Sequence, residues 1–499
     1  MAATAGGARA SASAAATAVR CLLPRLAHFL SASGAASVVR RRILLILAAV
    51  AVLAAGGVLA VLLVTRSGHT SGELDTALKG VTVSHPKPPK PKPHKPKPKP
   101  KPVVVSDKPC WLNFGGDPQR TLARVHIDLG TPTKPLWARG LHGYIEYPPS
   151  YCNGRLYVNT YHGRTYAIDA RTGDVIWKRE GTGPKPSTPA IAGDRVIVSS
   201  TSGTVIAYAR SDGRTLWQLQ VAAKVESSPV AIDKTAYFGA TDGRLFAVNT
   251  VSGRIRWAYQ TGGRINSSPS VFGRRICITT YAGSVLCLDR RNGHLLWIRY
   301  IQRDFLRDAS FYASASTDGL RLFTISRSGL VIALRASNGQ TLWTHDLSTT
   351  GYSTPAVANG RVFLGDFNGM ARAYNAATGR ELWARYVGGR ILGPALVVGP
   401  LVFFSTLEQK TFALRVADGR VMWHVGMGKY GPGIATDRHY YFSLNGILVA
   451  YRGRNSPPDT SLKRVAGAAA ATKASGATHS PRPSRHRPAQ STKPRATHR

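Results

Sequence analysis

The cysteines are the residues of this 499-residue sequence whose spacing most directly suggests chemistry. Cys277 and Cys287 lie five residues either side of Ala282 in a stretch typical of a β-hairpin, so we expect them to face each other across two strands. Such a pair can form a disulfide outside the cytoplasm. Cys110 and Cys152 form a second candidate pair, which would tie a leader segment to the first of the repeats described below.

Motifs for a catalytic or metal centre are missing from the rest of the sequence. It contains no CxxC pair, no GxSxG nucleophile elbow, no HExxH helix and no GxxxxGK[ST] phosphate loop. The histidines have no common spacing. Structural zinc, an iron–sulfur cluster and hydrolase or nucleotide chemistry therefore lack their characteristic ligands, and we assign no catalytic, cofactor-binding or metal-binding residue.

Tryptophans recur at a nearly constant interval, and this repeat indicates the strands on which any functional site would be built. Successive spacings are 40, 40, 40, 40, 46, 40 and 40 residues. Each period contains short β-branched and aromatic runs separated by glycine-containing turns, which is typical of a four-stranded antiparallel meander. We expect these tryptophans to pack between neighbouring units rather than to bind a ligand. They are Trp137, Trp177, Trp217, Trp257, Trp297, Trp343, Trp383 and Trp423.

The repeat predicts an all-β fold, an eight-bladed β-propeller of four-stranded antiparallel blades within residues 103–453. The first three strands of a blade occur eight times, beginning near Pro149 and ending with the set that starts near Pro432. The tryptophan-bearing fourth strand follows only the first seven sets, whereas Trp137 has no set before it. The simplest closure gives the strand of Trp137 to the last blade, which leaves no open sheet edge between blades.

Departures from the repeat are the best sequence candidates for a binding site. The longest interval places six extra residues in the sequence QRDFLRDASFY, residues 302–312, which mixes aromatic side chains with both signs of charge. We interpret this segment as an ordinary surface loop and keep a contact with a partner or peptide as the alternative hypothesis. Its candidate residues are Arg303, Asp304, Phe305, Arg307, Asp308 and Tyr312. The first repeat is rich in tyrosine, which we expect mostly to fill the core: Tyr144, Tyr147, Tyr151, Tyr157, Tyr161 and Tyr166.

The N-terminal region predicts one pass through a membrane. Residues 43–64 are 22 consecutive uncharged, mostly aliphatic positions, and about 20 suffice for a helix to span the hydrocarbon. Arginines at 40–42 favour a cytoplasmic segment 1–42, a transmembrane signal-anchor helix 43–65 and an extracytoplasmic remainder. A cleaved signal peptide is the alternative, but its apolar core is usually shorter. We therefore expect a single-pass protein of the cytoplasmic membrane, with its N-terminus inside and its propeller outside.

Two basic segments flank the predicted propeller. The linker 66–102 carries nine prolines and seven lysines in residues 86–102, which favours an extended polyproline II spacer whose lysines can also contact anionic polymer or lipid. The tail 454–499 has the composition of a disordered segment. The whole chain has a net charge of +41. We expect a protein or an anionic cell-envelope polymer as the partner, and the topology argues against nucleic acid.

The stretch AIDARTGDVIW, which ends at Trp177, resembles the docking motif of pyrroloquinoline quinone (PQQ)-like propeller repeats. Looser copies end at the later tryptophans, and WLNFGGDPQRT at residues 111–121 is similar to the leader that precedes the first blade in such proteins. The resemblance implies one of two functions. Quinoprotein dehydrogenases hold PQQ and calcium in the central funnel beside a catalytic aspartate, whereas non-enzymatic members, including the lipoprotein of outer-membrane barrel assembly, use the ring as a scaffold.

The residues favour the scaffold. Calcium requires six to eight oxygen ligands, and most propeller aspartates occupy turn positions that recur from blade to blade. The adjacent cysteine pair of many quinoprotein alcohol dehydrogenases is absent from the sequence, so we expect neither PQQ nor calcium. Our prediction is a membrane-anchored, extracytoplasmic, non-catalytic binding or scaffold module in cell-envelope assembly or wall attachment. A PQQ- and calcium-dependent quinoprotein dehydrogenase is the alternative.

Overall fold

The computed structural model describes residues 82–84, 110–181, 183–301 and 309–457, all within one compact unit that runs from Leu74 to Arg499. Among these residues no helix is long and apolar enough to span a membrane. The expected transmembrane helix 43–65, the proline-rich part of the linker and nearly all of the tail 454–499 lie outside the described residues.

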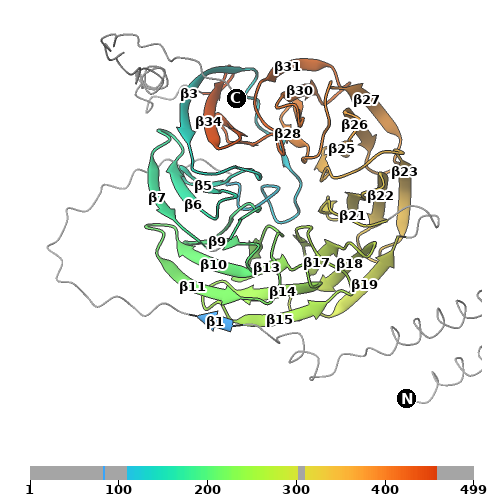
Figure 1. Cartoon of the computed structure of the whole chain (residues 1–499). Coiled ribbons are helices and arrows are strands. Elements are labelled where there is room, and N and C mark those ends of the chain that lie inside the picture. The colour runs from blue at the N-terminus through green and yellow to red at the C-terminus, as the bar shows by residue number, and fades with distance from the viewer. Residues whose placement is uncertain (1–81, 85–109, 182, 302–308, 458–499) are drawn as a thin grey trace, which may run out of the picture. The chain divides into compact units, whose positions relative to one another are not determined.

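Eight blades, each built on four antiparallel strands, surround a common centre, as Figure 1 shows, and confirm the predicted propeller. Two of the eight sheets gain a fifth strand from the N-terminal side of the chain. Blade 1 contains β4 (Ser150–Cys152), β5 (Arg155–Asn159), β6 (Thr165–Asp169) and β7 (Val175–Arg179); blade 2 contains β8 (Ala190–Ala192), β9 (Arg195–Ser199), β10 (Thr204–Ala209) and β11 (Thr215–Gln220); blade 3 contains β12 (Val230–Ile232), β13 (Thr235–Gly239), β14 (Arg244–Asn249) and β15 (Ile255–Gln260); blade 4 contains β16 (Ser270–Phe272), β17 (Arg275–Thr279), β18 (Ser284–Asp289) and β19 (Leu295–Tyr300).

The second half of the ring repeats this order. Blade 5 contains β20 (Ser316–Thr317), β21 (Arg321–Ile325), β22 (Leu330–Arg335) and β23 (Thr341–Asp346); blade 6 contains β24 (Ala356–Ala358), β25 (Arg361–Gly365), β26 (Met370–Asn375) and β27 (Glu381–Tyr386); blade 7 contains β28 (Leu396–Val398), β29 (Leu401–Ser405), β30 (Thr411–Arg415) and β31 (Val421–Val425); blade 8 contains β32 (Ile434–Ala435), β33 (His439–Leu444), β34 (Ile447–Gly453) and β3 (Pro132–Gly140).

The ring closes where the sequence predicts. Strand β3 pairs antiparallel with β34, with Trp137 opposite Ala450 and Ala138 opposite Val449. Figure 1 shows the teal β3 beside the red β34. The last blade is thus completed by a strand from the N-terminal side of the propeller, so opening the ring requires separating these two strands.

One strand lies in the linker 66–102, before the run 86–102 for which we predict a polyproline II spacer and which lies outside the described residues. Thr82–Ser84 forms β1, which pairs antiparallel with the outer strand β11 and makes blade 2 five-stranded. This strand was not predicted from the sequence. The physical reason is local: Thr82 and Val83 are β-branched residues that favour strands, they precede the proline run, and the edge of β11 offers free backbone groups.

The tryptophans link successive blades through backbone hydrogen bonds. The indole Nε1–H of Trp217 donates to the carbonyl of Thr250 in the next blade at 2.8 Å, and six other tryptophans of the series make the equivalent bond. Trp423 differs, because its Nε1 has no hydrogen-bond partner among the described residues. It instead contacts the rings of Phe403 and Tyr440.

A glycine lies under each of the seven bonded tryptophans. A Cβ atom added to Gly253, whose φ is +70°, would lie 2.8 Å from Cδ2 of Trp217. Two features therefore require a glycine at this position: its positive φ and the close approach of the indole ring. A side chain at this position would separate neighbouring blades.

We expect Gly253→Ala to lower the free energy of unfolding by about 2 to 4 kcal/mol, because the change adds backbone strain to overpacking against Trp217. Gly360→Ala is the matched control, since Gly360 also has a φ of +70° but no atom within 4 Å of the added Cβ. It should cost only about 1 kcal/mol. Thermal unfolding of the two variants measures the difference, and equal losses would contradict the indole contact.

Candidate functional site

The leader segment, defined here as residues 110–131, crosses the centre of the ring. Its residues form hydrogen bonds with the innermost strand of each blade or with the residues just before that strand. Trp111 pairs with Tyr151 of blade 1, and Ala123 and Arg124 form β2, which pairs parallel with β28 of blade 7. The other contacts are with Ile191, Ser228, Val271, Thr317, Val357 and Ala435 of blades 2, 3, 4, 5, 6 and 8.

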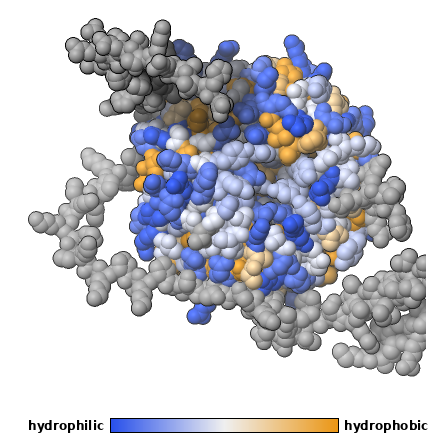
Figure 2. Space-filling view, viewed as in Figure 1, coloured by the Kyte–Doolittle hydropathy of each residue, from blue (hydrophilic) through white to orange (hydrophobic). Residues whose placement is uncertain are grey.

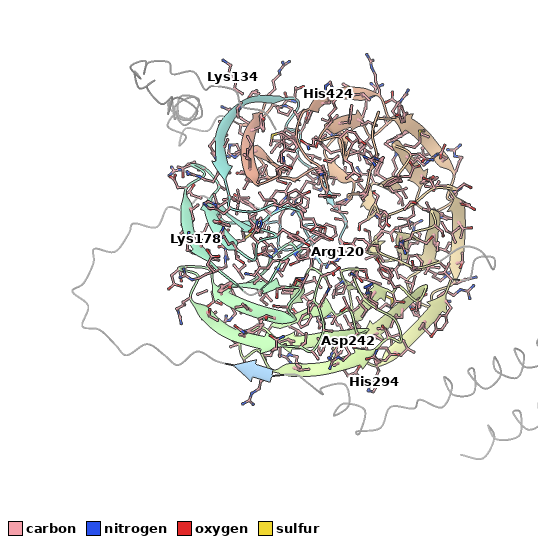
Figure 3. All side chains as sticks on the ribbon, in the orientation of Figure 1. Arg120, Lys134, Lys178, Asp242, His294 and His424 are labelled. Carbon is pink, nitrogen blue, oxygen red and sulfur yellow. A yellow bond between two sulfur atoms is a disulfide. The ribbon has the colours of Figure 1, made fainter. Side chains whose placement is uncertain are left out.

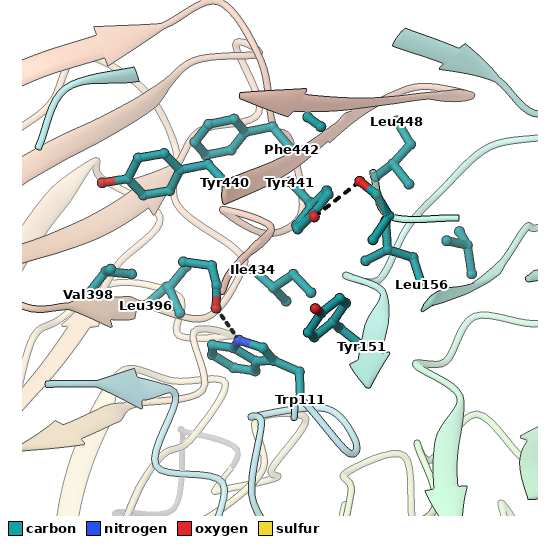
Figure 4. Packing of buried hydrophobic residues seen from close by; sticks show 14 of the residues in the cluster. Trp111, Tyr151, Leu156, Leu396, Val398, Ile434, Tyr440, Tyr441, Phe442 and Leu448 are labelled. Carbon is teal, nitrogen blue, oxygen red and sulfur yellow. Dashed lines mark hydrogen bonds between the residues drawn. The ribbon is translucent and has the colours of Figure 1, made fainter. Parts of the chain in front are cut away.

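Trp111 anchors the start of the leader segment. Its indole donates to the carbonyl of Ala435, and Figure 4 shows the ring beside Tyr151 and near Ile434. In the same view the hydroxyl of Tyr441 donates a hydrogen bond to the carbonyl of Ala170. Blades 1 and 8 are therefore held together by the leader segment as well as by their own side chains.

Arg120 lies near the centre of the ring and is fully buried (Figure 3). Its Nε donates to the carbonyl of Pro269 at 2.6 Å, Nη2 donates to that of Ser228 at 3.1 Å, and Nη1 donates to that of Phe114. Burial lowers the pKa of Arg120 to about 9, while the charge of Asp117 acts in the opposite direction. The guanidinium thus joins the leader segment to blades 3 and 4 through bonds to neutral carbonyls.

A chain of hydroxyl groups spaces five blades around the centre. In each of these blades the residue two before the innermost strand carries a hydroxyl group. The backbone N–H of one such residue donates to the side-chain hydroxyl of the corresponding residue in the next blade, at 2.9 to 3.1 Å. The series is Thr188, Ser228, Ser268, Ser314 and Thr354. Blades 7, 8 and 1 carry Pro394, Pro432 and Pro148 at the same position.

A pocket of about 160 Å³ opens at one end of this centre, and we call it the mouth pocket. Its floor includes Phe114 of the leader segment. Much of its wall comes from one register position, the residue four before the innermost strand of a blade. Six of the eight residues at that position line the pocket: Glu146, Asn266, Tyr312, Tyr352, Leu392 and Tyr430.

Aromatic rings pack edge to face around the mouth pocket. The ring centroids of Tyr312 and Tyr352 are 5.6 Å apart, and those of Tyr144 and Tyr430 are 5.8 Å apart. Of the six candidate residues in the loop 302–312, Tyr312 is the one that the structure describes, and it belongs to this wall. The other five lie outside the described residues: Arg303, Asp304, Phe305, Arg307 and Asp308. Burial raises the pKa of Tyr312 to about 12.

Acidic and amide groups complete the wall. Burial, with the charge of Glu226, raises the pKa of Glu146 to about 7. The side-chain Nδ2 of Asn266 donates to a carboxylate oxygen of Glu226. The other side-chain atom, Oδ1 of Asn266, is buried and has no hydrogen-bond partner in the part of the chain that the structure describes. Asn266 is thus held by Glu226, and its oxygen is buried without a donor among the described residues.

The remaining predicted residues are distributed over the scaffold. The structure contains disulfides between Cys110 and Cys152 and between Cys277 and Cys287. The second pair lies in direct register on β17 and β18, and the first joins the leader segment to blade 1. Of the tyrosines in the first repeat, Tyr147 lines the mouth pocket, Tyr161 is exposed, and three are buried: Tyr151, Tyr157 and Tyr166.

Sequence reasoning identified residues 111–121 as a leader but not their place at the centre of the ring, and it assigned no role to Arg120. It also missed the position four residues before the innermost strand of each blade, which we call the mouth position. A usable signal for the mouth position was present. Counting four residues back from each innermost strand gives a series that changes from blade to blade, Glu146, Pro186, Glu226, Asn266, Tyr312, Tyr352, Leu392 and Tyr430. Two residues further on, the same alignment gives the repeating hydroxyl or proline. The residue type thus changes from blade to blade at one position and stays regular two residues further on.

The residues around the mouth pocket do not fit PQQ with calcium. Calcium requires six to eight oxygen ligands, and the described lining supplies one carboxylate, Glu146, with Glu226 behind Asn266. Small-molecule sites usually measure about 300 to 1,000 Å³, and this pocket is smaller because the leader segment fills the centre. Within the described residues no group of three or more histidine, cysteine, aspartate or glutamate side chains could hold a metal ion.

The ring of repeated four-stranded blades defines the class of this chain, a PQQ-like β-propeller protein. A family model described as outer membrane protein assembly factor BamB matches residues 127–316 and 306–439. Because these matches cover more than half of the chain, the chain belongs to this family.

Individual relatives are more distant. The BamB proteins of Yersinia pestis and Escherichia coli K12 are 33% and 32% identical to this chain over 89 residues, which is 17% of this chain and 20% of each relative. The match thus spans about a fifth of the length of these relatives.

Solved structures with lower identity share the architecture. Quinohemoprotein alcohol dehydrogenase from Comamonas testosteroni superposes with a TM-score of 0.60 at 14% identity, over 72% of this chain and 83% of that one. The computationally designed Ika8 protein superposes with a TM-score of 0.55 at 12% identity, over 64% and 100%. At such identities the likeness shows the fold alone.

Proposed function

We propose that this chain is a non-catalytic binding module that holds a protein partner at the mouth pocket. In this proposal the propeller is displayed outside the cytoplasmic membrane by the segment 43–65 and acts as a scaffold in cell-envelope assembly or wall attachment. The observation that carries the proposal is the leader segment, which occupies the centre of the ring and leaves the aromatic mouth pocket at its end.

The geometry supports binding over catalysis in two ways. The leader segment is bonded to all eight blades, so the loops around the mouth pocket are held on a rigid support. Tyrosine is the most frequent residue in the pocket lining, and it is enriched in protein-binding surfaces because it offers a large contact area and a polar hydroxyl. Membership of a family described as an assembly factor supports the same class of function.

The basic surface supports a secondary contact with anionic envelope polymer. Residues 103–453 alone carry a net charge of +19. Figure 2 shows hydrophilic residues over much of one face, with hydrophobic residues in separate patches. We propose that this surface concentrates the chain near anionic polymer, while the mouth pocket selects the partner.

Cross-linking in intact cells tests the proposal. The full chain is expressed as wild type, as the mouth variant Tyr352→Ala/Tyr430→Ala, and as the control Val251→Ala, whose exposed side chain lies in a turn between β14 and β15. After cross-linking, we expect the mouth variant to retain at most about a tenth of the wild-type partner yield, because aromatic anchors dominate interface energies. The control should retain all of it. Equal yields from both variants would contradict binding at the mouth pocket.

The quinoprotein alternative predicts a different result. Adding PQQ and calcium to the purified full chain should produce neither a bound-quinone absorbance nor dye-linked alcohol oxidation, because the mouth pocket lacks the calcium ligands and the volume. Saturable quinone binding with alcohol oxidation would overturn the non-catalytic proposal.

A further inference from the structure

The turns that join the first to the second strand and the third to the fourth strand of a blade lie at one edge of the ring. They share this edge because the first and third strands of an antiparallel meander run in the same direction. Apart from Phe114, the mouth pocket is lined by the connections between blades, so it opens at the opposite edge. Blades 3, 4 and 5 follow one another in the ring (Figure 1). We call their turns and the adjoining strand residues the basic arc: residues 232–235, 249–255, 272–275, 289–296, 317–321 and 335–341.

Positive charge exceeds negative charge in the basic arc. It contains eight arginine and lysine residues and three aspartates. Each aspartate is already in an ion pair: Asp233 with Arg290, Asp289 with Arg274, and Asp318 with Arg321. The first of these pairs also joins the turns of blades 3 and 4. Four exposed cations of the arc take part in no ion pair within the described residues: Lys234, Arg254, Arg291 and Arg335.

Three leucines of the arc are exposed beside these cations. Leu320, in the turn between β20 and β21, is 74% exposed, and Leu295 and Leu296 at the start of β19 are 42% and 46% exposed. Hydrogen bonds place the two groups next to each other. The N–H of Ala336 donates to the carbonyl of Leu320 at 2.8 Å, and the indole of Trp297 donates to the carbonyl of Ala336 at 3.1 Å. The basic arc therefore combines surplus cations with exposed aliphatic side chains on neighbouring blades.

An anionic phospholipid surface supplies a contact for both kinds of side chain. Its phosphates accept hydrogen bonds from guanidinium groups, whose planar fork can hold one phosphate through two N–H donors. Each basic residue close to such a surface raises the affinity about fivefold. The interface between headgroups and acyl chains takes up aliphatic side chains. A soluble polyanion offers the phosphates without an apolar phase, and it would leave the leucines in water.

We propose that the basic arc docks the propeller on the surface of an anionic phospholipid membrane. In this arrangement the four unpaired cations contact headgroup phosphates, and the three leucines enter the interface. The mouth pocket lies at the opposite edge of the ring, so a docked propeller leaves it open to a partner. The inference adds a second contact to the proposed function and does not depend on what the mouth pocket binds.

Photo-cross-linking in vesicles tests the proposal. The full chain is reconstituted with vesicles of phosphatidylglycerol and phosphatidylcholine in equal parts, which contain a trace of a phosphatidylglycerol analogue with a photoreactive headgroup. Mass spectrometry then identifies the cross-linked peptides. We expect at least about tenfold more cross-links in the peptides of the basic arc than in those of the opposite edge, and a similar loss of arc cross-links when phosphatidylcholine replaces phosphatidylglycerol. Cross-links distributed equally over the two edges would overturn the proposal.

Two variants with the same loss of charge assign the contact to the arc. Arg254→Gln/Arg291→Gln removes two unpaired cations from the turns of blades 3 and 4, and Lys224→Gln/Arg264→Gln removes two exposed cations from the connections that lead into the same blades. At about fivefold for each cation, the arc variant should lose at least about tenfold of its cross-linking, whereas the control should keep it. Equal losses would mean that the contact follows net charge, which would refute docking through the arc. Thermal unfolding checks that each variant is folded.

The leucines distinguish a membrane from a soluble polyanion. Leu296→Ser/Leu320→Ser should reduce cross-linking to the vesicles at least about tenfold, because two aliphatic side chains lose their contact with the interface. The same variant should bind soluble poly(glycerol phosphate) as the wild type does, measured by calorimetry. Vesicle cross-linking that survives the serine changes would show that the arc acts through charge alone. That result, or tighter binding of the soluble polymer than of the vesicles through Arg254 and Arg291, would overturn the lipid surface as the partner.

Discussion

Replacing Arg120 with methionine should lower the free energy of unfolding by at least about 3 kcal/mol. The change keeps an unbranched, apolar stem of similar length but removes every donor, so the carbonyls of Phe114, Ser228 and Pro269 lose their bonds to the guanidinium in a buried site. Each buried acceptor left without a partner costs about 1 to 3 kcal/mol. Chemical denaturation of the full chain measures the loss.

Arg179→Met is the control for the loss of Arg120. Arg179 also donates to three carbonyls, those of Lys178, Gly213 and Asp212, but it lies at the rim where water can replace the lost bonds. Its replacement should cost about 1 kcal/mol or less. If the two variants lose the same stability, Arg120 does not hold the leader segment in the ring as we describe.

Trp137→Ala should be the most damaging of the tryptophan changes, because it acts on the closing strand. The indole is buried, donates to Ala170 at 3.0 Å and lies on β3, whose pairing with β34 joins the two ends of the ring. We expect a loss of about 3 to 5 kcal/mol and rapid proteolysis of the opened propeller. The unfolding midpoint and the rate of limited proteolysis provide the two readouts.

Trp423→Ala is the matched control for ring closure. Trp423 is only partly buried, and its Nε1 has no hydrogen-bond partner among the described residues, so its removal should cost at least about 1 kcal/mol less than that of Trp137. A larger loss at Trp423 would mean that closure by β3 is not the weak point of the ring.

The fold could be predicted from the sequence because one interaction repeats from blade to blade. Seven of the eight blades pack an indole over a glycine at a nearly constant spacing, so selection for one contact leaves a period in the sequence. The unpaired strand of Trp137 and the unfinished last blade then determined the closure. Strand β1 was missed, because three residues beside a proline run carry no periodicity of their own.

The leader segment could not have been placed from its residues. Most of its bonds to the blades join backbone N–H and carbonyl groups, as between Ile191 and Leu112 or Val271 and Pro118, and such bonds leave no pattern of side chains. The role of Arg120 could not be predicted for a related reason, since its hydrogen-bond partners are backbone carbonyls rather than acidic side chains. The mouth position was visible only after the innermost strands had been located, because its residues are related by register and not by type.

Amide hydrogen exchange of the leader segment in the full chain tests the account most directly. If residues 111–124 cross the ring as described, their bonded amides should exchange as slowly as those of the innermost strands, and Arg120→Met should accelerate them. Exchange as fast as that of an unstructured chain would mean that the centre of the ring is open. The mouth pocket would then lose its floor, and with it the argument for binding at that place.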